Sequence, residues 1–123
     1  MRPAVRLARE TAAPNDVATQ VEWRIAEAPL AADEGRLAEA ELLVGEALAL
    51  VQPTDFLELR GQAYEALAHV EARAGRPEDW RRGLEQAVAE HRRKGNIVEE
   101  QRIGGLLGGP PPTPSAQAVV SKP

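Results

Sequence analysis

The sequence predicts an all-α fold of about five helices, and three observations support this prediction. Apolar residues recur at steps of three and four between about residues 16 and 107, which is the period of an amphipathic helix. Glycine or proline separates each such segment from the next, and no segment alternates apolar and polar residues as a strand does. The connections are short, so consecutive helices are expected to form antiparallel hairpins.

The first predicted helix begins near residue 16, where Asn15 or Asp16 can accept a hydrogen bond from a first-turn amide. Its apolar side follows the series Val17, Val21, Ile25, Ala28 and Ala32. Pro29 lies inside this series and has no amide donor, so a kink or an early break is expected there. Gly35 is expected to end the element, because glycine adopts a positive φ at low cost.

The next two predicted helices cover residues 37–51 and about 54–74. The first has a continuous apolar side and stops before Pro53, which cannot continue a helix. The second carries the longest apolar series in the chain: Phe56, Leu59, Ala63, Leu67, Val70 and Ala74. Thr54 or Asp55 is expected at its start, and Gly75 is expected to close it.

The fourth predicted helix covers about residues 77–93 and begins with a proline, which the first turn of a helix tolerates. Its apolar side is formed by Trp80, Leu84, Ala87, Val88 and His91. His91 is expected at the edge of the core with one ring nitrogen hydrogen-bonded. Gly95 is expected to end this helix in the left-handed conformation, and Asn96 to cap a fifth helix over residues 97–107.

The predicted helices define a single domain over residues 16–107. Residues 1–15 are expected to be a partly ordered N-terminal segment, with a truncated helix as one interpretation. Residues 108–123 are rich in proline and glycine and have no periodicity, so we expect a disordered tail. Four of the five residues 110–114 are proline, which favours a polyproline conformation there.

The chain contains an internal repeat, because residues 32–51 resemble residues 72–91 at an offset of 40. The identities are Ala32/Ala72, Gly35/Gly75, Arg36/Arg76, Ala47/Ala87 and Ala49/Ala89. Each block has the order helix, Gly-Arg turn, helix, so each repeat is predicted to be one helical hairpin. Trp80 stands where the first block has Ala40. We expect the indole to cover the fifth helix near Ile97 and not to force the hairpin apart.

This order resembles the tetratricopeptide repeat, a helical hairpin of about 34 residues. In the second unit the positions that match its two helices are Tyr64, Leu67, Ala68, Trp80, Leu84 and Ala87. In the first unit Ala40, Val44 and Ala47 match, whereas Arg24 and Glu27 replace an aromatic residue and a leucine. The period of 40 is longer than usual, with the extra residues near "PTDFLE". The resemblance implies an α-α superhelix of antiparallel hairpins.

A second resemblance covers residues 8 to about 107 and is carried by "TDFLELRG" and by the "KGN" after the fourth predicted helix. These segments are similar to the carboxy-terminal helical-repeat region of large actinobacterial regulators. Such regulators carry a class III adenylate/guanylate cyclase domain and an AAA or signal-transduction ATPase module ahead of the repeats. The resemblance implies a regulatory segment without catalytic activity, and we expect the chain to be a truncated or separately encoded piece of such a regulator.

A polar line along the third predicted helix is the candidate partner-binding site: Gln62, Glu65, His69 and Arg73. In tetratricopeptide hairpins this face lines the groove that binds partner peptides, so the resemblance implies a partner groove here. An ordinary solvated face is the alternative interpretation. A clamp for a terminal carboxylate is not expected, because matching positions on the first helix hold Glu22, Ile25 and Pro29 in place of lysine or asparagine.

Composition and motifs argue against other classes of function. Nineteen acidic and fifteen basic residues give a net charge of −4, which does not favour nucleic acid or an anionic membrane. The longest strictly apolar run, residues 47–51, is too short to span a bilayer. No cysteine occurs, which fits a cytoplasmic location. The two histidines lack metal-ligand spacing, and the two serines lie in the predicted tail, so no catalytic, cofactor or metal site is expected.

The sequence thus predicts a non-catalytic protein-protein interaction or regulatory scaffold module with a protein or peptide partner. Self-association is a further expectation, because two hairpins bury little core and about three are usually needed. The alternative is a small helical ligand-binding protein or enzyme with a site that no motif indicates. A nonfunctional remnant of a larger gene is a third interpretation.

Overall fold

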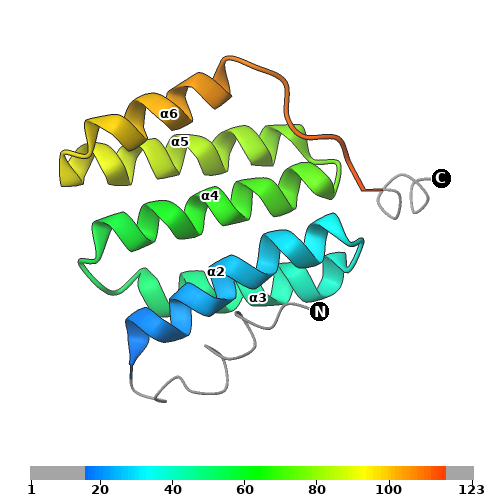
Figure 1. Cartoon of the computed structure of the whole chain (residues 1–123), viewed down its shortest axis with the longest axis horizontal. Coiled ribbons are helices and arrows are strands. Elements are labelled where there is room, and N and C mark those ends of the chain that lie inside the picture. Colours follow the sequence, from blue (N-terminus) through cyan, green and yellow to red (C-terminus); the bar gives the residue numbers. More distant parts are fainter. Residues whose placement is uncertain (1–15, 116–123) are drawn as a thin grey trace.

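The computed structural model describes residues 16–115, and the fold is all-α (Figure 1). Within these residues there is no β-strand. The helices are α2 (Val17–Asp33), α3 (Leu37–Val51), α4 (Leu57–Arg73), α5 (Pro77–Lys94) and α6 (Ile97–Leu107). The predicted N-terminal segment and residues 116–123 lie outside the described residues.

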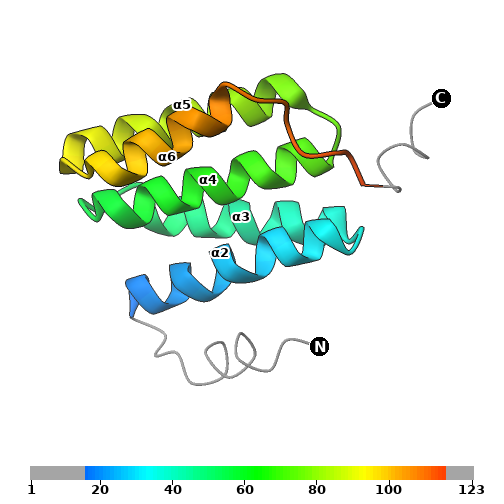
Figure 2. The ribbon, with the colours of Figure 1, turned by 45° about the horizontal axis from the view of Figure 1, so that its top comes forward.

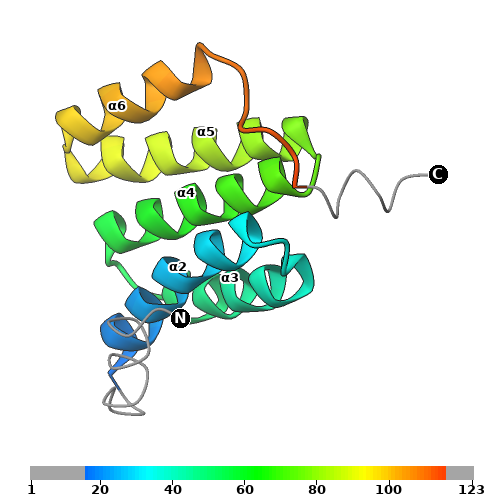
Figure 3. The ribbon, with the colours of Figure 1, turned by 45° about the vertical axis from the view of Figure 1, so that its right-hand side comes forward.

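Consecutive helices run antiparallel, and α4 lies at the centre of the molecule. Figures 1 and 3 show α2 and α3 on one side of α4, with α5 and α6 on the other. Helix α4 packs on α2, α3 and α5, while α6 packs on α5. In Figure 2, α2 and α3 again lie on one side of α4, with α5 and α6 on the other. Alanines fill much of the core, so the helix backbones can approach one another closely.

Helix α2 continues through Pro29 to Asp33, so the predicted early break at this proline is wrong. Ala28, Ala31 and Ala32 on the same helix are fully buried. Because a helix in a folded protein is held mainly by the packing of its buried side, the residues around Pro29 remain helical although one backbone donor is missing.

Three helices end at a glycine with positive φ, as predicted for Gly35 (84°), Gly75 (80°) and Gly95 (82°). In each case the amide of the following residue donates to the carbonyl of the residue five positions before it. The three N···O distances are 2.8 Å for Arg36, 2.9 Å for Arg76 and 2.8 Å for Asn96. The two Gly-Arg turns therefore have the same backbone geometry, which confirms the repeat of helix, Gly-Arg turn and helix.

Two of the predicted helix caps are confirmed, and a third start is displaced. The Asp16 carboxylate accepts the Thr19 amide at 3.1 Å, and the Asn96 side chain accepts the Glu99 amide at 3.3 Å. Helix α4 begins at Leu57, later than predicted. The Thr54 hydroxyl instead accepts the Phe56 amide at 3.1 Å and belongs to the turn before the helix.

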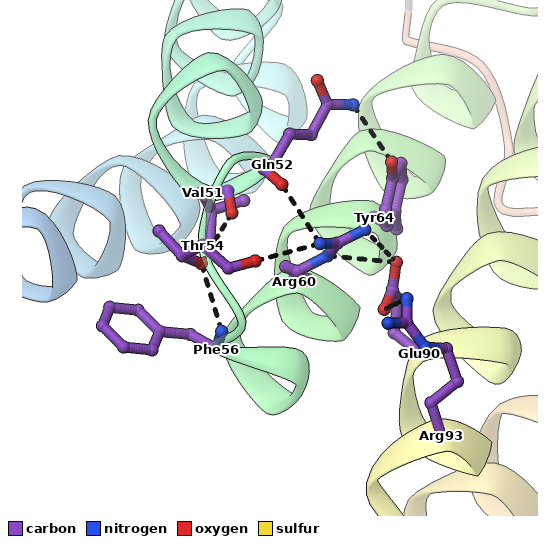
Figure 4. Close-up of polar contacts among 8 residues, drawn as sticks. All are labelled: Val51, Gln52, Thr54, Phe56, Arg60, Tyr64, Glu90 and Arg93. Atoms are coloured by element: carbon purple, nitrogen blue, oxygen red, sulfur yellow. Dashed lines mark hydrogen bonds and ion pairs between the residues drawn. The ribbon is translucent and has the colours of Figure 1, made fainter.

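Arg60 holds the long connection between the hairpins (Figure 4). One guanidinium nitrogen donates to the carbonyl oxygens of Gln52 at 3.1 Å and Thr54 at 3.0 Å. The other two bind a carboxylate oxygen of Glu90 on α5, at 3.1 and 2.9 Å. The Glu90 side chain is only 5% exposed. This group therefore joins the residues before α4 to both helices of the second hairpin.

Trp80 is 5% exposed and covers α6, as predicted, but at the other end of that helix. It packs with Ala68, Ile103 and Leu107, whereas Ile97 is 62% exposed. The hairpin stays closed because Gly83, three residues further along α5, meets α4. A Cβ at Gly83 would lie 3.0 Å from the Cβ of Ala68. The expected contact near Ile97 is therefore wrong.

His91 is fully buried, and neither ring nitrogen has a hydrogen-bond partner, so the prediction of one satisfied nitrogen is wrong. The ring lies against Gly61 of α4, where an added Cβ would be 2.5 Å from the Nε2 atom. Because glycine leaves the α4 backbone bare at this point, the imidazole fits between the helices as a packing group.

Candidate functional site

Three of the four predicted groove residues line one depression between α2 and α4, here called the central hollow. They are Gln62, Glu65 and His69, and Ile25 and Pro29 of α2 form the opposite wall. The volume of this hollow is about 300 Å³. Its walls combine apolar side chains with an exposed amide, a carboxylate and an imidazole.

A second depression, the acidic hollow, adjoins the central hollow at Gln62, which lines both. It lies beside the start of α4 and has a volume of about 440 Å³. Glu22, Asp55 and Glu58 line it together with a single cation, Lys94. The excess of carboxylates gives this end of the face a negative charge.

A third depression, the proline hollow, adjoins the central hollow at Glu65 and His69. Its volume is about 320 Å³. The remaining walls come from α5, α6 and the segment after α6: Trp80, Leu84, Leu106, Pro110, Pro111 and Pro112. The three hollows follow the polar line of α4 and share its side chains, and together they are called the α4 groove below.

Glu65 is bound by Arg102 of α6 through two hydrogen bonds of 2.9 and 2.7 Å. Arg102 also donates to Glu99 on its own helix at 2.7 Å. These bonds raise the pKa of the Arg102 guanidinium, and the bond to Glu99 lowers the pKa of that carboxyl. Since Glu65 lines two hollows, its pair with Arg102 lies at their boundary.

His69 and Arg73 meet at one carboxylate, that of Asp33 at the end of α2. The His69 Nε2 atom lies 2.7 Å from Asp33 Oδ1, and the Arg73 Nε atom lies 3.2 Å from the same oxygen. Arg73 also donates to the Asp33 carbonyl oxygen at 3.3 Å. This cluster joins the C-terminal ends of α2 and α4 at one edge of the groove.

The segment after α6 returns to this cluster. The Arg73 guanidinium donates to the Thr113 carbonyl oxygen at 2.7 Å, and the Ser115 amide donates to the Arg73 carbonyl oxygen at 2.7 Å. Ser115 is 3% exposed. Figure 1 shows the segment running from the end of α6 towards the turn between α4 and α5. The prediction placed residues 108–123 in a disordered tail, and residues 108–115 of it have these defined contacts.

Sequence reasoning missed four residues that complete the groove: Asp33, Arg102, Trp80 and Thr113. Sequence separation explains two of these omissions, because Asp33 and Thr113 are 40 positions before and after Arg73. Arg102 gave one usable signal in the sequence. It is a single arginine after the paired carboxylates of "IVEEQR", which indicates an ion pair with a neighbouring carboxylate. The contact of Thr113 is made by its backbone carbonyl, for which side-chain identity gives no signal.

The described residues show no arrangement suited to metal binding, since no three His, Cys, Asp or Glu side chains converge between residues 16 and 115. In the same range, no helix has the length and apolar character needed to cross a membrane. No protein family matches this chain, and no curated protein or solved structure is significantly similar to it.

Proposed function

We propose that this chain is a non-catalytic protein-protein interaction module that binds an extended peptide segment of a partner in the α4 groove. The observation that carries the proposal is the continuity of the three hollows through Gln62, Glu65 and His69. A row of shallow hollows with shared polar rims suits a peptide backbone with side chains on alternate positions. It suits a compact small molecule less well, because such ligands favour a single deep cavity.

The length of α4 sets the length of the partner segment. Its 17 residues span about 25 Å at a rise of 1.5 Å each. An extended peptide rises about 3.3 Å per residue, so about seven or eight residues would cover the groove. The acidic hollow favours a basic residue at the end of the segment near Glu22 and Glu58.

The proposal also concerns the setting of the module. The order of contacts, with α4 packed on both helices of the preceding hairpin, supports a repeat of the tetratricopeptide type. The similarity of "TDFLELRG" and "KGN" to cyclase and ATPase regulators supports a regulatory scaffold in the cytoplasm. On this proposal, the partner segment transmits a signal to an activity that belongs to another domain or chain.

A ligand-binding protein or enzyme is the competing proposal, and the described residues offer it three buried charged or titratable groups. Each has a structural partner: the Glu27 carboxylate pairs with Arg36, the Glu90 carboxylate is bound by Arg60, and His91 fills the space above Gly61. None of the three lines any of the hollows. The groove therefore supports the interaction module better.

The test is a selection of peptides of about ten residues from a random library on the full chain, followed by binding measurements with two variants. Gln62→Trp places an indole where the acidic and central hollows meet and leaves the ion pairs of Glu65 and Arg73 in place. We expect it to weaken the binding of selected peptides at least about tenfold, an effect of the size found for residues at the centre of an interface.

Gln101→Trp is the matched control, because Gln101 is an exposed glutamine on α6 that lines none of the three hollows. It should bind selected peptides as the unaltered chain does. Equal loss of binding in both variants, or a selection that enriches no peptide, would contradict the proposed groove. A double charge reversal, Glu65→Arg with Arg73→Glu, then tests whether the polar line contributes to the binding.

A further inference from the structure

Residues 110–115 border one end of the α4 groove. Pro110, Pro111 and Pro112 form a wall of the proline hollow opposite Trp80, Leu84 and Leu106. The chain beyond them is fixed by two hydrogen bonds to a single residue of α4, Arg73. The segment thus makes the two kinds of contact that a bound peptide makes, apolar contacts by side chains and hydrogen bonds by the backbone.

The two bonds with Arg73 recognise the backbone of an extended chain. The Arg73 side chain donates to the carbonyl oxygen of residue 113, and its own carbonyl oxygen accepts the amide of residue 115. In an extended chain, the carbonyl of one residue and the amide two positions later point to the same side. Pro114 between them has no amide and leaves no donor without a partner.

The Arg73 carbonyl oxygen also needs a hydrogen-bond donor from outside the helix, because it belongs to the last residue of α4. The last four carbonyl oxygens of a helix have no amide partner within that helix. The Ser115 amide supplies one such partner at 2.7 Å. Any extended segment with an amide at this point would supply the same bond, so the end of α4 does not distinguish the chain's own tail from a partner.

We infer that residues 110–115 are an internal ligand of the groove, and that the partner segment for the proline hollow is an extended proline-rich peptide of another chain. The inference rests on the proposed function, since it assigns the chemistry of the peptide that this groove binds. About 320 Å³ of the hollow stays open beside the three prolines. A partner segment that takes the place of these prolines with a bulkier apolar side chain fills more of the hollow, and so displaces the chain's own segment.

Competition between tail and partner sets how tightly the partner binds. A tethered segment acts at an effective concentration in the millimolar range when its linker is short. Only two glycines separate α6 from Pro110. A peptide added in solution therefore meets a groove that is already occupied, and its apparent affinity falls by the fraction of chains with a free groove.

The test uses the full chain with a released tail, in which Pro110, Pro111 and Pro112 become serine and Ser115 becomes proline. These changes remove the apolar contacts and the amide that binds the Arg73 carbonyl oxygen. The probe is the fluorescein-labelled peptide GGPPPTPS with an amidated C-terminus, and the readout is fluorescence anisotropy. We expect the released chain to bind this probe roughly tenfold or more tightly than the unaltered chain.

Two further variants make the result specific. Pro114→Ser alters an exposed proline of the same segment that lines no hollow, and it should leave the probe affinity as in the unaltered chain. Adding Arg73→Gln to the released chain removes the donor to the probe carbonyl, and it should cancel the gain. Equal probe affinities of the released and unaltered chains would overturn the inference.

The failure of this inference and the failure of the proposed function have different signatures. If library peptides bind at Gln62 but the probe does not bind the released chain, the groove binds peptides and the assignment of a proline-rich segment is wrong. If neither the library peptides nor the probe binds, the proposal that the α4 groove binds peptides is wrong. Light scattering of the unaltered chain completes the test, because a dimer that dissociates on release would place the segment on a second copy and overturn its internal position.

Discussion

The two hairpins, α2–α3 and α4–α5, share one turn and fill equivalent positions differently. Their Gly-Arg turns agree in φ to within a few degrees and in hydrogen bonding. At an offset of 40, however, Val21 and Val51 correspond to Gly61 and His91. All four residues are buried. The two hairpins thus share the backbone of the turn but divide the buried side-chain volume differently between their two helices. This is possible because a core must be filled to a given total volume, while the residue at each position can vary.

The same contrast explains which hairpin carries an extra helix. Ala40 in the first hairpin is fully buried within its own hairpin and the adjoining α4, whereas its counterpart Trp80 reaches α6. In the second hairpin, α4 and α5 approach each other closely at Ala68 and Gly83. A large residue at one position and a glycine three residues later therefore turn a hairpin surface into a docking site for the next helix.

Replacing Trp80 by alanine, the residue of the first hairpin, is expected to have the largest effect. It removes the side chain that joins α5 to Ile103 and Leu107 of α6. We expect a loss of about 4 kcal/mol in the free energy of unfolding, measured by urea denaturation, as for other buried aromatic residues. Amide hydrogen exchange should accelerate in α6 more than in α2. Uniform acceleration in all helices would mean that Trp80 does not hold α6 in particular.

The second hairpin has the Arg60–Glu90 ion pair where the first hairpin has Gln20 and Leu50, and replacing Arg60 is expected to have the next largest effect. Arg60→Gln leaves the Glu90 carboxylate, 5% exposed, with only the 3.3 Å contact to Arg93. We expect a loss of about 3 kcal/mol in unfolding free energy.

The double variant Arg60→Gln with Glu90→Leu copies the first hairpin and should lose less than the single variant, because no charge is then left buried without its partner. Chemical denaturation of both variants in parallel measures the difference. A double variant that is less stable than Arg60→Gln would show that the remaining contact of Glu90 with Arg93 contributes more than the burial of the carboxylate costs.

Gly61 and His91 provide a smaller and more selective test. Gly61→Ala puts a Cβ 2.5 Å from the His91 ring and should cost about 2 kcal/mol of unfolding free energy. The same substitution in a His91→Ala background should stabilise the chain by up to about 1 kcal/mol, because alanine is the better helix former.

Gly45→Ala is the matched control for this cycle, since a Cβ on this exposed glycine of α3 meets nothing within 4 Å. It should stabilise the chain by up to about 1 kcal/mol in either background. If Gly61→Ala and Gly45→Ala change the melting temperature in the same direction in the unaltered chain, the ring of His91 does not define the packing of the second hairpin.

The weakest expected effect distinguishes the starts of the two hairpins. The carboxylate of Asp16 caps α2, while α4 starts after Phe56 without a side-chain cap. Hydrogen bonds from the Thr19 hydroxyl and amide lower the pKa of Asp16 below its ordinary value of 3.8. The cap therefore stabilises the fold fully above pH 3.8 and loses this contribution as the pH falls through the lowered pKa.

The amide resonance of Thr19 reports this titration in an NMR experiment. Its midpoint should lie below pH 3.8, and Asp16→Asn should abolish it, because asparagine retains a capping oxygen but does not titrate. A midpoint above this value would contradict the hydrogen-bonded cap.

The period of the apolar residues and the glycines at the helix ends were enough to predict the helices, because both signals depend on residues close in sequence. The turns at Gly35, Gly75 and Gly95 were predicted correctly for this reason. Local patterns predicted the polar line along α4 but not what closes the groove around it, since Asp33 and Thr113 lie 40 residues away in each direction. The unpaired His91 was missed because its fit depends on the absence of a side chain at Gly61.

The attachment of Ser115 to Arg73 has a mechanical consequence. A pull on the C-terminal end of the chain reaches the end of α4 and, through Asp33, the end of α2 before it stretches the link to α6. The load falls on two backbone-directed bonds and one ion pair, all at the same edge of the molecule. Tension applied at Ser115 therefore acts on this edge of the molecule before it acts on α6.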